Sequence, residues 1–148
     1  MKYIIFLVLS ATLQAQKIPV NFIRFDYSMS NVVGLNVSIF IERGYSKDNV
    51  STLTISNSVK FTDETKTLKI SNVYFDEIVD YFFKIDPRVL SNTFDSGLDG
   101  SNVKIEIGQL FTSSIEYNFN NYSYDYKAIK ETIQVILKNA KVRIQDFK

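Results

Sequence analysis

Apolar and polar residues alternate over most of the first half of the chain, and this period of two restricts the fold more than any other feature. The alternation is clear in residues 20–27 and 33–42, so each segment predicts a strand with one buried face. Residues 50–56 are rich in β-branched side chains and predict a third strand, while residues 59–62 and 67–70 predict shorter strands. The short polar connections between these segments favour an antiparallel β-meander.

The period changes at Ser71, after which apolar residues recur at spacings of three and four. This spacing places them on one face of a helix, for which Ser71 is the expected N-cap. The helix is expected to end before Asp86, because Pro87 follows it. Residues 128–140 show the same spacing and predict a second amphipathic helix.

Between the two predicted helices, alternation returns in residues 103–107 and 115–119, which predict a hairpin that turns within residues 108–114. Strands joined by short connections form antiparallel sheets, and two one-sided helices must bury their apolar faces. The expected fold class is therefore α+β. A mainly antiparallel sheet, made of the N-terminal meander and the later hairpin, should carry both helices on one face.

The chain begins with the three parts of a cleavable signal peptide, namely the cation Lys2, an apolar run, and a small residue at Ala15. The apolar run is much shorter than the roughly 20 residues that a membrane span needs. We therefore expect residues 1–15 to be a signal peptide and residues 16–148 to form a single small domain. The mature protein should be exported, to the periplasm or the extracellular medium, without stable membrane insertion.

The chain has no histidine and no cysteine. These absences exclude Ser-His-Asp and Cys-His catalytic sites, thiolate metal sites and disulfides, so the sequence favours a protein that is not an enzyme. Removing residues 1–15 takes away only Lys2, which leaves 16 basic and 16 acidic residues. A neutral chain without a basic cluster lacks the electrostatic attraction that nucleic acids and anionic lipids exert, so neither is an expected partner.

The segment before the hairpin has part of the spacing of an EF-hand calcium loop. Asp95, Asp99 and Glu106 occupy the first, fifth and twelfth positions, and a glycine occupies the sixth. Gly97 stands where the third ligand is normally found, and a strand rather than a helix follows. In the alternative interpretation, Asp99 belongs to a turn that leads into the strand, and Glu106 points to solvent. Calcium is the only cofactor that the sequence brings forward.

A tyrosine-rich segment joins the predicted hairpin to the last helix. Aromatic faces beside amide and carboxylate groups suit the binding of a protein or a sugar. In the alternative interpretation, these tyrosines lie half-buried over a helix end. The candidate partner-binding residues are Asn120, Asn121, Tyr122, Tyr124, Asp125 and Tyr126.

Three functions fit these observations. The first is an exported, non-catalytic binding domain that acts on another protein, as an inhibitor or an immunity-type protein does. The second is a carbohydrate or small-ligand binding module that uses the tyrosine-rich segment. The third is a carboxylate-based hydrolase, which needs two carboxyl groups facing each other in a cleft. Asp76, Glu77 and Asp80 are clustered, but they are expected on the solvated face of the first helix.

Overall fold

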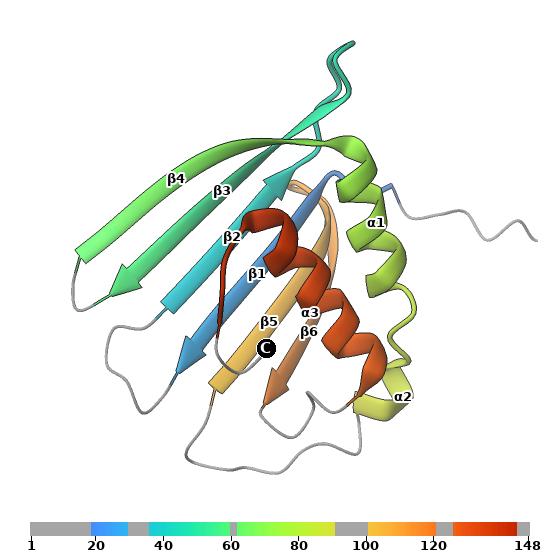
Figure 1. Cartoon of the computed structure of the whole chain (residues 1–148). Coiled ribbons are helices and arrows are strands. Elements are labelled where there is room, and N and C mark those ends of the chain that lie inside the picture. The colour runs from blue at the N-terminus through green and yellow to red at the C-terminus, as the bar shows by residue number, and fades with distance from the viewer. Residues whose placement is uncertain (1–18, 30–35, 60–61, 91–100, 121–125, 145–148) are drawn as a thin grey trace, which may run out of the picture.

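The computed structural model describes residues 19–29, 36–59, 62–90, 101–120 and 126–144. Its elements, in chain order, are β1 (Phe22–Met29), β2 (Asn36–Glu42), β3 (Val50–Val59), β4 (Thr62–Ser71), α1 (Asn72–Phe82), α2 (Pro87–Leu90), β5 (Ser101–Gln109), β6 (Ser113–Asn120) and α3 (Lys127–Ala140). Helices α1 and α3 lie side by side on one face of the sheet (Figure 1). This arrangement confirms the predicted α+β fold.

The sheet has six strands in the order β4-β3-β2-β1-β5-β6, and all neighbours are antiparallel. The first strand, β1, therefore lies in the interior of the sheet. The chain then runs outward through β2, β3 and β4, and after α1 and α2 it returns to pair β5 with the other side of β1. The register aligns apolar residues across strands, because Ile23 lies opposite both Ile41 and Ile107. Cross-strand pairs of this kind stabilise a sheet and fix its register.

The core lies between the helix-bearing face of the sheet and the two long helices. Burial of each large apolar side chain contributes about 1.5–3 kcal/mol. The predicted N-cap is confirmed, because the Ser71 hydroxyl accepts a hydrogen bond from the N–H of Val73. The largest fully buried side chains are Ile23, Phe25, Ile39, Ile41, Leu53, Phe75, Ile78, Phe82, Ile105, Ile107, Ile129 and Ile133.

Two expectations about the end of the meander are wrong. The segment 59–62 is not a strand of its own, since β3 continues to Val59 and β4 begins at Thr62. Strand β4 is a continuous ten-residue strand rather than a short one over 67–70. The period-two signal is missing from its first half because the side chains at 64–67 are all exposed, as they are at a sheet edge that the core does not reach.

The other face of the sheet is mainly polar, apart from the stacked rings of Phe22 and Phe40, and is covered by no described element (Figure 1). Charged residues pair across its strands, as Lys104 of β5 does with Glu116 of β6 at 3.0 Å. Within the described residues, no helix has the length and apolar character that crossing a membrane requires.

Candidate functional site

Segments from distant parts of the chain meet at one end of the sheet. These are Asn21, the β2–β3 loop (residues 43–49), the β5–β6 turn (residues 110–112) and Val73 at the start of α1. We call this set of residues the Asn21 end. It lies where β1 starts and β4 passes into α1, near the top of Figure 1.

Asn21 ties the two loops of this end together. Its N–H donates to the carbonyl oxygen of Gly108 at 2.8 Å, and its own carbonyl accepts from the N–H of Arg43 at 2.9 Å. Its side-chain Oδ1 accepts from the N–H of Leu110 at 2.8 Å. One residue therefore holds both the β2–β3 loop and the β5–β6 turn through hydrogen bonds.

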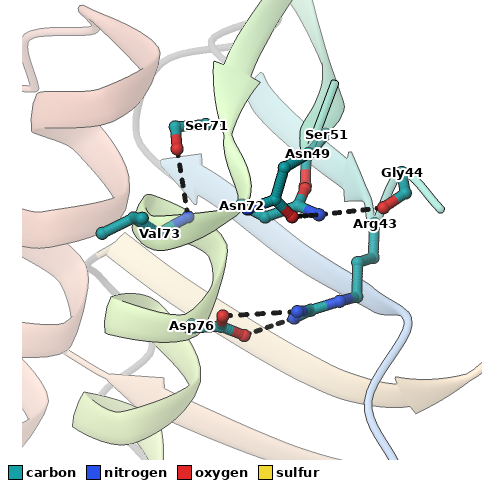
Figure 2. Close-up of polar contacts among 8 residues, drawn as sticks. All are labelled: Arg43, Gly44, Asn49, Ser51, Ser71, Asn72, Val73 and Asp76. Atoms are coloured by element: carbon teal, nitrogen blue, oxygen red, sulfur yellow. Dashed lines mark hydrogen bonds and ion pairs between the residues drawn. The ribbon is translucent and has the colours of Figure 1, made fainter. Parts of the chain in front are cut away.

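Asn72 fixes the β2–β3 loop to the start of α1 (Figure 2). Its side chain is only 3% exposed. The amide Oδ1 accepts from Ser51 Oγ at 2.6 Å, and Nδ2 donates to the Gly44 carbonyl at 2.9 Å and to Asn49 Oδ1 at 2.8 Å. Both amide protons and the amide oxygen are thus bonded, as a buried amide requires.

Two residues of this loop have special backbone requirements. A Cβ added to Gly44 would lie 1.7 Å from the carbonyl oxygen of Val50, so no other residue fits there without a shift of the backbone. Asn49 has a φ of 54°, in the left-handed region that asparagine tolerates better than most residues. The loop conformation is therefore specified by the sequence as well as by Asn72.

A shallow groove of about 210 Å³ runs along α1 beside this end. Arg43 pairs with Asp76 across it through two hydrogen bonds (Figure 2). The guanidinium carbon of Arg43 lies 5.2 Å from the centre of the Phe75 ring. The hydrogen bond from Arg43 to the Asp76 carboxylate raises the pKa of Arg43 above its usual value. The groove is lined by Pro19, Val20, Arg43, Phe75, Asp76, Val79, Asp80 and Phe83.

The three most exposed large hydrophobic residues in the described part of the chain all belong to the Asn21 end. Phe111, in the β5–β6 turn, has a relative exposure of 103%, Tyr45 has 78% and Val73 has 66%. Phe111 also has a φ of 68°. A left-handed conformation costs a non-glycine residue roughly 1–2 kcal/mol. Phe111 occupies the third position of the β-turn that is closed by the hydrogen bond from the N–H of Thr112 to the Gln109 carbonyl, a position with positive φ where glycine is usual. Phe111 is thus both strained and uncovered.

Comparison of the chain with protein-family models, curated proteins and solved structures found no match.

The predicted calcium ligands are only partly described. Asp95 and Asp99 lie outside the described residues. Glu106 lies on β5, in the strand that the alternative interpretation expected, with Arg24 and Glu116 as its cross-strand neighbours. The described residues contain no group of three or more acidic side chains that could hold a metal ion.

The tyrosine-rich segment is described only at its two ends. Asn120 is the last residue of β6, and Tyr126 is the exposed N-cap residue of α3, where its side chain makes no capping hydrogen bond. Asn121, Tyr122, Tyr124 and Asp125 lie outside the described residues.

The sequence-based prediction missed Phe111 and Tyr45. It identified both segments as turns or loops but did not consider their apolar residues. The signal was present in Leu110 and Phe111, because two large apolar residues inside a predicted turn have no core position to occupy. The role of Asn21 was out of reach, since it depends on the pairing of β1 with β5.

Proposed function

We propose that the protein is an exported, non-catalytic binding domain that acts on another protein through its Asn21 end. The observation that carries this proposal is Phe111, a fully exposed aromatic residue in a left-handed backbone conformation at the tip of a hairpin. Large aromatic side chains provide much of the affinity at protein interfaces. A residue that costs stability in the free protein is best explained by a contact it makes in a complex.

The shape of the Asn21 end favours a protein over a small ligand. Small-ligand sites are usually enclosed cavities of about 300–1,000 Å³. The groove beside this end is shallower and smaller, at about 210 Å³, and Tyr45 and Phe111 project from loops instead of lining a cavity. Aromatic anchors beside a groove with an ion pair at its rim match the composition of protein interfaces.

The test is affinity capture with the mature chain, residues 16–148, and with two variants. The wild-type chain, Phe111→Gly and Tyr126→Ala are immobilised and exposed to the exported fraction of the native culture, and bound proteins are quantified by mass spectrometry. Tyr126→Ala is the matched control, because it removes an exposed aromatic residue at the start of α3, outside the Asn21 end.

We expect a stoichiometric partner to bind the wild type and Tyr126→Ala, and to be depleted at least tenfold with Phe111→Gly. Glycine adopts positive φ freely, so this variant should unfold at the same or a higher denaturant concentration, with a gain of at most about 1 kcal/mol. Loss of binding would then not reflect loss of folding. A partner retained by Phe111→Gly but lost with Tyr126→Ala would refute the Asn21 end as the site and favour the tyrosine-rich segment.

A further inference from the structure

The two edges of the sheet are protected unequally. An exposed edge strand presents unpaired backbone groups, and proteins commonly block such edges with charged side chains. Strand β4 carries exposed Glu64 and Lys66 on the helix-bearing face and Lys69 on the polar face. Strand β6 contains no lysine and no proline, and its single charge, Glu116, is neutralised by Lys104. Within the described residues, the β6 edge therefore has fewer of the charged side chains that discourage another strand from pairing than the β4 edge has.

The direction of the β6 backbone groups follows from the register. The Gly108 carbonyl accepts from the N–H of Asn21, so Gly108 directs its backbone groups toward the β1 side of β5. Ser114 lies opposite Gly108, and residues alternate in direction along an antiparallel strand. The backbone groups of Ser114, Glu116 and Asn118 therefore point to the free edge.

We propose that a second copy of this chain pairs with this edge, β6 against β6, in an antiparallel register centred on Tyr117. When two β6 strands pair about a two-fold axis, the residues whose backbone groups point to the free edge must lie opposite one another, because these groups form the hydrogen bonds between the strands. Two registers do this over nearly the whole strand. The register centred on Glu116 places this carboxylate opposite itself, which is destabilising. The register centred on Tyr117 places Glu116 opposite Asn118 of the second copy.

The side chains of β6 complement one another in this register. Within one chain, Asn118 Nδ2 already donates to Glu116 Oε1 at 3.0 Å. The Glu116–Asn118 pairs across the axis would form the same kind of amide-to-carboxylate hydrogen bond. On the helix-bearing face, Ile115 faces Phe119 of the second copy, and Tyr117 faces itself. Ile115 and Tyr117 are only half-buried, so a second copy would cover apolar surface that α1 leaves open. The two six-stranded sheets become continuous.

Because the chain contains no cysteine, single introduced cysteines can report this register. Two variants, Glu116→Cys and Asn118→Cys, are oxidised separately and as an equimolar mixture. Facing residues in hydrogen-bonded antiparallel pairs have Cα atoms about 5.5 Å apart, within the range for a disulfide. Thr65→Cys and Thr67→Cys form the matched control, since these exposed residues lie two apart on the other edge strand, β4.

We expect a disulfide-linked product of twice the chain mass only in the mixture of Glu116→Cys and Asn118→Cys, and a concentration-dependent doubling of mass in sedimentation of the unmodified chain. No linked product in the mixture would overturn the proposal. A linked product from Glu116→Cys alone would overturn it too, because it would place the axis at residue 116. The experiment needs no other protein and leaves Phe111 unchanged, so its outcome is independent of the proposed function.

Discussion

Replacing Asn72 with alanine tests whether one buried amide holds the β2–β3 loop on α1. In the native chain the Asn72 side chain bonds to Ser51, Gly44 and Asn49. The truncation removes all three hydrogen bonds and leaves their partners behind. The loop would then be held to the start of α1 by the backbone hydrogen bond from the N–H of residue 72 to the Asn49 carbonyl and by the Arg43–Asp76 ion pair.

The cost follows from the burial of the partners that remain. Ser51 has no exposed surface, so its hydroxyl loses its acceptor without access to water, at a cost of about 1–3 kcal/mol. The Gly44 and Asn49 oxygens belong to partly exposed residues, where water replaces the lost donor at a smaller cost. We expect Asn72→Ala to lower the free energy of unfolding by about 2–4 kcal/mol, a large part of the 5–15 kcal/mol that is typical of a domain.

Urea denaturation followed by circular dichroism measures this loss directly. With a slope of about 2 kcal/mol per molar urea, the middle of the usual range, the midpoint should fall by roughly 1–2 M. Ser51→Ala combined with Asn72→Ala should cost less than the two single changes together, because their mutual hydrogen bond is lost only once. Asn36→Ala, at an exposed asparagine of β2, is the control and should change stability by less than about 0.5 kcal/mol. A loss below about 1 kcal/mol for Asn72→Ala would refute the reasoning.

Two further predictions concern pH and a glycine. Burial, assisted by the negative charge of Asp86, raises the pKa of Tyr117, so the folded chain holds this proton more tightly than the unfolded chain. The resulting stabilisation is complete below the unfolded pKa of about 10 and is lost as pH rises through the folded pKa. At high pH the urea midpoint should therefore fall less in Tyr117→Phe, which has no proton to lose, than in the wild type. Equal falls in the two proteins would contradict this prediction. Gly44→Ala should lower the thermal midpoint by several degrees, because its Cβ would overlap the Val50 carbonyl, and an unchanged midpoint would show that the loop adapts.

The sequence predicts those elements of the fold that have one buried face. Strands β1, β2 and β5 and helices α1 and α3 each repeat apolar residues with the period of their own geometry, and all were expected close to where they lie. The first half of strand β4 was not predicted, because an edge strand beyond the reach of the helices has no apolar face and therefore shows no alternation. Helix α2, at Pro87–Leu90, is a single turn and too short to show a period.

The candidate site was harder to predict, because it depends on strand order rather than on local pattern. Asn21 and Leu110 are 89 residues apart and meet only because β5 pairs with β1. Alternation shows that a segment is a strand but not which strand lies beside it. The sequence-based prediction therefore turned to local composition and selected the tyrosine-rich segment. The site proposed from the structure is instead carried by two aromatic residues in separate turns.

In the proposed complex, the hydrogen bonds of Asn21 and Asn72 would reduce the conformational entropy that the exposed loops lose on binding. Fixing the backbone of a free loop on binding costs about 1–2 kcal/mol for each residue that becomes ordered. Asn21 and Asn72 hold the backbone on both sides of Tyr45 and next to Phe111 before any partner arrives. The cost of ordering the backbone is then met during folding, so more of the aromatic contact energy remains for binding. By this reasoning Asn72→Ala should weaken partner binding even under conditions where the variant stays folded, chiefly through faster dissociation.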